Sequence, residues 1–198
     1  MTLSRLDAQL HDARRASEIP DLPEHTWSIL ATTIHAEIRG LDEMTINRLR
    51  NTMAIPPERY YEELVAFQAW MDIAHTMAAE PVIVRAQVMT ELYVAFVWLR
   101  DPLLQPLADA LQNPQAALST VHQFLSNGHR RRLRNAVAHG RWCYRPHFDG
   151  LECWDGRPPQ HFTVSDGDLQ AWQLLSRGTA IAAILAVTDG YPLTGSPA

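Results

Sequence analysis

The stretch HRRRLRNAVAHG, residues 129–140, divides this chain into two parts with different patterns. It predicts a short basic helix, because Leu133 and Val137 are four residues apart and can face a core together while arginines cover the other side. Gly140 is a typical helix end. Beyond it the sequence changes to short aromatic runs, so the stretch marks the boundary between a helical part and a strand-rich part.

The residues before this stretch predict a series of helices. Pro57 and Pro81 suit first-turn positions of two long helices. The second of these is apolar on most sides, as expected of a central helix, and Asp101-Pro102 is expected to end it. The predicted helices span residues 3–13, 24–39, 42–53, 57–79, 81–99, 114–125 and 129–139.

The residues after the stretch predict a small antiparallel meander. Three short aromatic runs, at 142–144, 151–154 and 161–164, are separated by the turn dipeptides Asp149-Gly150 and Asp155-Gly156. Trp142 and Tyr144 are expected to pack this meander on the helices rather than to stack on nucleic-acid bases. A last helix follows, from Asp168 to about residue 188, capped by Ser165 or Asp166.

The two cysteines predict free thiols. A two-residue turn at Asp149-Gly150 would place Cys143 opposite Gly156 and Cys153 opposite Pro146, so the cysteines would not face each other. Two thiols in 198 residues are typical of a reducing compartment rather than of a disulfide scaffold. The chain starts without an apolar signal core, and its apolar runs are too polar or too short to cross a bilayer. We therefore expect a soluble cytoplasmic protein without a membrane partner.

The charge is unevenly distributed. No acidic residue lies between Asp109 and Asp149, and the six arginines in that interval give it a formal charge of +6. The whole chain carries −5, so the remainder carries −11, and general coating of nucleic acid is excluded. A local positive field on an acidic protein indicates an anionic ligand at one place. We expect RNA there, held by Arg130, Arg131, Arg132, Arg141 and Arg145.

Three residues in the stretch suit phosphodiester chemistry. His139 can carry a proton at neutral pH, Arg134 can offer a planar fork to a phosphate, and Asn135 can orient either partner. Asn135 and His139 share a helix face, whereas Arg134 lies about 140° round the axis from His139 at roughly 100° per residue. The sequence has no C-x-x-C pair, no H-E-x-x-H motif and no glycine-rich phosphate loop, so neither a metal nor a cofactor is expected.

The residues LRNAVAHGRW, 133–142, resemble the signature of the HEPN superfamily, in which an Arg, a polar residue and a His lie late in a helix of an all-helical bundle. The resemblance implies a mainly α fold, a HEPN-like bundle of four to six helices with the β-meander inserted between the motif helix and the last helix. It implies a HEPN-like domain over residues 56–190, with the meander at 142–164. Residues 1–55 would then form an N-terminal helical arm, and residues 191–198 a flexible tail.

The resemblance also implies a function. Many HEPN proteins are metal-independent endoribonucleases that act as homodimers in toxin–antitoxin or phage-defence systems. By this resemblance Arg134 and His139 form the catalytic pair and Asn135 supports them, and a cognate antitoxin protein is a possible partner. Arg141 stands where toxins paired with a nucleotidyltransferase-like antitoxin often carry Tyr. Two alternatives stay open: a non-catalytic HEPN-like RNA- or protein-binding module, and an unrelated bundle in which Arg134 and His139 are structural.

Overall fold

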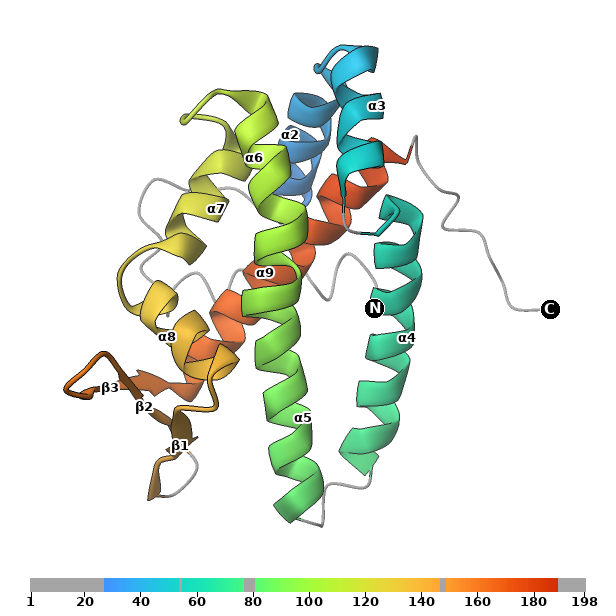
Figure 1. The fold of residues 1–198 in the computed structure, drawn as a ribbon. Helices are drawn as coiled ribbons and strands as arrows, with labels where there is room; N and C mark the ends of the chain where they lie inside the picture. The colour runs from blue at the N-terminus through green and yellow to red at the C-terminus, as the bar shows by residue number, and fades with distance from the viewer. Residues whose placement is uncertain (1–26, 54, 77–80, 147–148, 189–198) are drawn as a thin grey trace.

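The computed structural model describes residues 27–53, 55–76, 81–146 and 149–188, which form a mainly helical protein with a small three-stranded sheet (Figure 1). The expected helix at 3–13 and the expected tail at 191–198 lie outside these residues. The elements are α2 (Trp27–Arg39), α3 (Glu43–Thr52), α4 (Pro57–Thr76), α5 (Pro81–Tyr93), η1 (Val94–Trp98), η2 (Arg100–Leu104), α6 (Gln105–Leu111), α7 (Ala117–Ser126), α8 (Gly128–Ala138), β1 (Trp142–Tyr144), β2 (Gly150–Asp155), β3 (Gln160–Ser165) and α9 (Asp166–Val187).

The last helix, α9, is the centre of the core. It is buried along most of its length and packs on α2, α4, α7 and η1. Figure 1 shows it crossing behind the column formed by α5, η1, η2 and α6. The Ser176 hydroxyl donates a 2.6 Å hydrogen bond to the Ala95 carbonyl oxygen, which ties α9 to η1 inside the core. As predicted, Ser165 caps the helix, with its hydroxyl oxygen accepting from the backbone N–H of Asp168.

One helix is capped by a distant residue. Ala116, before α7, has no side chain that can accept a hydrogen bond. Instead the Glu37 carboxylate on α2 accepts from the backbone N–H groups of Ala117 at 2.6 Å and Leu118 at 3.2 Å. A carboxylate at a helix N-terminus satisfies free N–H groups and complements the helix dipole. This contact fixes α2 against the part of the chain that leads into the motif helix.

The expected helix end at Asp101-Pro102 is wrong, because the chain continues in wide π-helical turns through η1 and η2 into α6. Hydrogen bonds in these turns reach back five residues, from Leu99 to Val94 at 2.9 Å and from Leu104 to Leu99 at 3.0 Å. Proline cannot donate a helix hydrogen bond, and its ring clashes with the carbonyl four residues earlier in a regular α-helix. A wide turn relieves that clash, so Pro102 stays inside a continuous helical column.

The meander is confirmed as an antiparallel sheet with strand order β1-β2-β3, between α8 and α9. The register predicted from a turn at Asp149-Gly150 is wrong: Cys143 lies opposite Glu152, and Trp142 lies opposite Cys153. The backbone N–H of Arg145 donates to the Gly150 carbonyl, so the connection is longer than two residues and shifts the pairing by four. The inner face packs on α8 and α9.

The cysteines are unpaired, as expected, although their register differs. Cys143 is exposed, and Cys153 is buried under the sheet. Burial is the main cause that raises the pKa of the Cys153 thiol to about 12, and the nearby charges of Cys143 and Glu152 contribute to the same shift. Cys153 therefore acts as a core residue rather than a nucleophile.

No helix within the described ranges combines the length and apolar character that spanning a bilayer requires.

Candidate functional site

The motif helix α8 forms as the sequence predicts, with Leu133, Ala136 and Val137 buried and the basic residues on the opposite side. Its end is closed by two hydrogen bonds, from the N–H of Gly140 to the Val137 carbonyl and from the N–H of Arg141 to the Ala136 carbonyl. This pattern requires a left-handed residue, and Gly140 has φ of +63°. The turn places His139 at the C-cap, directly after the last helical residue Ala138, and Arg141 directly before β1.

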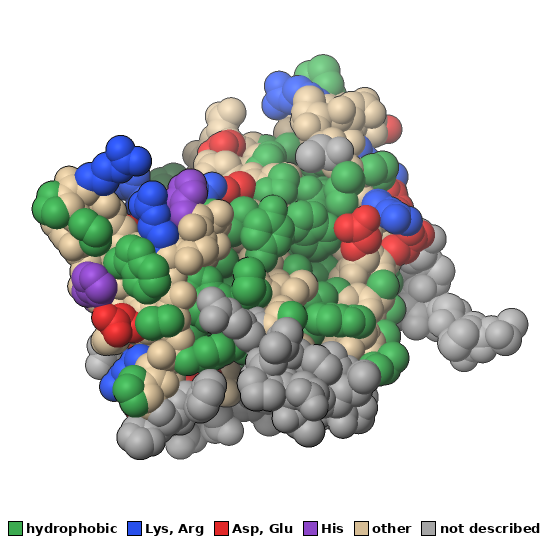
Figure 2. All heavy atoms as spheres, turned by 60° about the horizontal axis from the view of Figure 1, so that its bottom comes forward, with side chains coloured by type: hydrophobic (Ala, Val, Ile, Leu, Met, Phe, Trp, Pro, Cys, Tyr) green, Lys and Arg blue, Asp and Glu red, His purple; other side chains and the backbone are tan. Residues whose placement is uncertain are grey.

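A polar cleft of about 390 Å³ lies between α8 and the wide turn η2. Its walls combine three arginines with one carboxylate and two amides, which leaves a net positive charge. The lining residues are Arg100, Asp101, Gln105, Arg131, Arg134 and Asn135. Figure 2 shows arginine and histidine side chains gathered toward the end of the molecule that carries the meander. The cleft thus has the charge and the donor groups that an anionic ligand needs.

The guanidinium group of Arg134 is held in a defined orientation. Its Nη2 atom forms an ion pair with Asp101 Oδ2, and its Nη1 donates to Asn135 Oδ1 at 3.1 Å. Its Nε is buried and finds no acceptor within the described part of the chain. A buried N–H without a partner is costly. The Arg134 guanidinium is therefore oriented in advance by Asp101 and Asn135.

A second arginine of the cleft wall, Arg100, belongs to a partly buried hydrogen-bonded chain. Arg100 Nε donates to Ser126 Oγ at 3.0 Å, and Ser126 Oγ lies 3.2 Å from His122 Nε2. Arg100 Nη1 also lies 3.2 Å from Asp101 Oδ1. Burial lowers the pKa of Arg100, and the charge of Asp101 opposes that effect. Asp101 thus links Arg100 to Arg134 across the cleft.

His122 makes stability depend on pH. Burial lowers its pKa below the ordinary value of 6.5, and the positive charge of Arg100 lowers it further. The unfolded chain then takes up a proton near pH 6.5, where the folded protein does not, so the free energy of unfolding falls as the pH drops below that value. We expect His122→Gln, which keeps a hydrogen-bonding group near Ser126, to flatten this fall. Urea unfolding from pH 7.5 to pH 5 measures it, and parallel curves for both proteins would contradict it.

His139 is not brought into the cleft. Its backbone N–H bonds to the Asn135 carbonyl, one turn back along α8, and its side chain is exposed. It is not among the residues that line the cleft. Within one chain, therefore, the structure joins Arg134 and Asn135 with Asp101, and it leaves His139 at the open end of the helix. The catalytic assignment of these residues stays a prediction.

Two of the five arginines expected to bind RNA are engaged within the protein. Arg130 donates through Nε to the Phe124 carbonyl at 2.6 Å, and its guanidinium lies 3.7 Å from the centroid of the Phe124 ring. Arg132 forms two hydrogen bonds to the Asp155 carboxylate, at 2.9 and 2.7 Å, and lies 4.2 Å from the Phe162 ring centroid. These contacts anchor α8 to α7 and to the sheet.

The other three are differently placed. Arg131 lines the cleft, Arg141 begins the segment that enters β1, and Arg145 lies 3.5 Å from Asp149 in a loose ion pair. Arg131 is exposed, and Arg141 and Arg145 are partly exposed. Of these three arginines, only Arg131 lines the cleft.

Trp142 and Tyr144 pack the meander on the helices, as expected. Trp142 is 3% exposed and belongs to the core, and Tyr144 packs against that core. Their rings meet edge to face, with centroids 5.6 Å apart. The half-exposed indole of the meander belongs instead to Trp154, which the sequence did not single out.

Sequence reasoning missed half of the cleft. Arg100, Asp101 and Gln105 lie in a segment that was expected to end a helix, and no local pattern pairs Asp101 with Arg134, 33 residues later. The signal that could have found them is a proline after a charged pair in an otherwise continuous apolar helix.

No group of three or more His, Cys, Asp or Glu side chains that could hold a metal ion is present within the described ranges. Comparison of the whole chain with protein-family models, with curated proteins and with solved structures finds no match.

Proposed function

We propose that this protein is a metal-independent endoribonuclease that cleaves RNA by attack of the strand's own 2'-hydroxyl. The observation that carries the proposal is the orientation of Arg134, whose guanidinium is held by Asp101 and Asn135 at a positively charged cleft. The motif resemblance supports the same function. The further proposal of a toxin or phage-defence role with a cognate antitoxin rests on this resemblance alone.

The proposed reaction needs one base and one acid. The 2'-oxygen forms a bond to phosphorus as its proton leaves, and the bond to the 5'-oxygen breaks as that oxygen gains a proton. The products are a 2',3'-cyclic phosphate and a 5'-hydroxyl end, and no water is consumed. Arg134 and Arg131 would bind the phosphate oxygens, and His139 would transfer one of the protons.

A second copy of the chain would complete the site. His139 sits at the exposed end of α8 and outside the cleft of its own chain, so the imidazole reaches a phosphate at that cleft most readily from a partner copy. A twofold axis near the α8 ends would place the His139 imidazole of each copy beside the cleft of the other. The homodimer is therefore part of the proposal.

The test is cleavage of a labelled single-stranded RNA of mixed sequence in the presence of EDTA. We expect products that end in a 2',3'-cyclic phosphate and no cutting of the same sequence made as DNA, which lacks the nucleophile. Arg134→Ala should slow cleavage by about 10²–10³-fold, as loss of one preorganised donor does. Arg48→Ala on α3, which removes an exposed arginine elsewhere, is the matched control. Equal cutting by the wild type and Arg134→Ala would reject the role of the cleft.

The alternative is a module that binds RNA or a protein at the same cleft without cutting. The observation that favours it is that Asp101 already neutralises part of the charge of Arg134, while His139 lies outside the cleft. Wild-type protein that binds RNA in EDTA but leaves it intact, with or without added Mg²⁺, would select this alternative.

A further inference from the structure

The small sheet has an outer face beside the motif helix, opposite the face that packs on α8 and α9. Side chains alternate across each strand, and those of Leu151, Cys153, Phe162 and Val164 point into the core. The opposite face carries two cross-strand rows that are exposed or half-exposed. One row contains Cys143, Glu152 and Thr163, and the other contains Arg141, Trp154 and His161.

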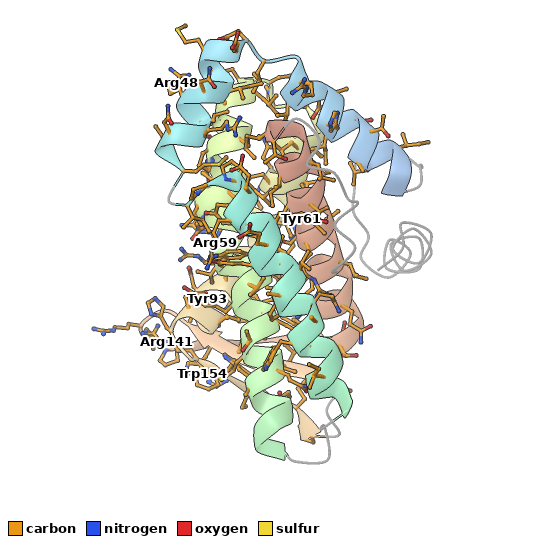
Figure 3. All side chains as sticks on the ribbon, turned by 90° about the vertical axis from the view of Figure 1, so that its right-hand side faces the viewer. Arg48, Arg59, Tyr61, Tyr93, Arg141 and Trp154 are labelled. Atoms are coloured by element: carbon orange, nitrogen blue, oxygen red, sulfur yellow. The ribbon has the colours of Figure 1, made fainter. Side chains whose placement is uncertain are left out.

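The second row joins two aromatic rings to a cation. Trp154 lies opposite His161 across β2 and β3, and their rings stack with centroids 6.0 Å apart and an interplanar angle of 26°. On its other side, the backbone N–H of Trp154 donates to the Arg141 carbonyl at 3.0 Å, which brings Arg141 into the same row. Figure 3 shows Arg141 and Trp154 on the same side of the molecule. This backbone hydrogen bond thus places Arg141 next to Trp154 in the row.

The acids near this row are already paired. Glu152 Oε1 lies 2.8 Å from His161 Nδ1, and Asp155 holds Arg132 through two hydrogen bonds. The hydrogen bond from Arg132 is the main reason that the pKa of Asp155 is lowered, and Arg141 adds to that effect only through its charge. No described carboxylate lies within ion-pair distance of the Arg141 guanidinium. Its charge is therefore available to a phosphate.

We propose that this outer face, defined by Arg141, Trp154 and His161, is a stacking surface for an unpaired base of single-stranded RNA; the identity of the nucleic acid rests on the proposed function. The exposed part of the Trp154 ring stacks on the base, and Arg141 binds the adjacent phosphate. A base inside a duplex has both faces covered by its neighbours, so the surface selects single strands. It adjoins the proposed cleavage site, because only Gly140 separates His139 from Arg141.

The experiment measures binding apart from cleavage. The probe is a fluorescein-labelled 2'-O-methyl 12-nucleotide RNA of mixed sequence, which lacks the free 2'-hydroxyl and cannot be cut by the proposed reaction. Fluorescence anisotropy gives Kd for the full-length protein. We expect Trp154→Ala to raise Kd by about 5- to 150-fold, the usual effect of losing one stacked ring. Trp154→Phe should restore most of the binding, and Trp70→Ala, at an indole 43% exposed on α4, should leave Kd unchanged.

The outcomes separate this inference from the proposed function. Loss of binding in Trp154→Ala with rescue in Trp154→Phe supports the surface, whether or not the wild type cuts unmodified RNA. Equal Kd values for the wild type and Trp154→Ala overturn it, and so does a duplex probe that binds as tightly as the single strand. Absence of wild-type binding also overturns it. A third outcome separates the two proposals: Arg134→Ala loses cleavage, while Trp154→Ala keeps the wild-type Kd and KM. This result would support the nuclease and reject the stacking surface.

Discussion

His139→Ala should lower the rate constant for RNA cleavage by about 10²–10⁴-fold, the range that a positioned proton carrier contributes. The protein should stay folded, because the His139 side chain is exposed and the helix is closed by backbone hydrogen bonds around Gly140. The loss should appear in kcat rather than in KM, since the imidazole acts in the transition state while the arginines bind the phosphate.

Single-turnover cleavage in EDTA measures this effect. His35→Ala is the matched control, because His35 is an exposed histidine on α2, away from the cleft. Mixing the His139→Ala and Arg134→Ala variants tests whether the site is built from two copies. If each cleft takes its imidazole from the partner, a mixed dimer has one cleft with both Arg134 and His139. Mixing should then restore part of the cleavage activity. Wild-type rates in His139→Ala would remove histidine from the mechanism.

Trp172→Ala should lower the free energy of unfolding by about 3–5 kcal/mol, as truncation of a large core aromatic does. Trp172 is 6% exposed on α9, meets the Phe96 ring edge to face at 6.4 Å, and lies 5.5 Å from the Arg130 guanidinium. Its removal leaves a cavity and loosens the contact between α9 and the start of α8. For a chain of this size the loss corresponds to a fall in Tm of about 6–20 °C.

Trp172→Phe is the informative partner of this variant. The indole N–H of Trp172 is buried and finds no acceptor among the described residues, so replacing it with an apolar ring removes an unsatisfied donor and keeps most of the packing. We expect Trp172→Phe to lose less than half of what Trp172→Ala loses in urea unfolding followed by circular dichroism. Equal losses would mean that the indole N–H itself contributes to the free energy of unfolding and that packing of the ring does not account for the whole effect.

The sequence predicted the features that depend on local chemistry. Pro57, Pro81 and Ser165 mark helix starts through their own backbone and side-chain preferences, and Gly140 marks a helix end. The mainly helical fold and the place of the meander followed from the change of period after the motif helix. Arg134 and Asn135 were correctly placed late in that helix for the same reason.

The features that the sequence pattern did not predict depend on contacts between segments far apart in the chain. The ion pair of Arg134 with Asp101 joins two elements that no sequence period relates. The strand register depends on the length of the connection between β1 and β2. The dipeptide Asp149-Gly150 predicted a two-residue turn, whereas the connection is longer. The roles of Arg130 and Arg132 were not predicted, because the sequence of a basic run does not distinguish an arginine that faces solvent from one that packs on an aromatic ring. Arg130 lies over Phe124, and Arg132 lies over Phe162.

The wide turns at η1 and η2 shift the phase of the helical column. Each hydrogen bond that spans five residues instead of four takes one more residue into its turn, and each residue corresponds to about 100° of rotation in a regular helix. The face that α6 presents to its neighbours is therefore rotated from the one that a regular helix continued from α5 would present. A one-residue deletion in this column would rotate Asp101 away from Arg134 while preserving every residue of the motif.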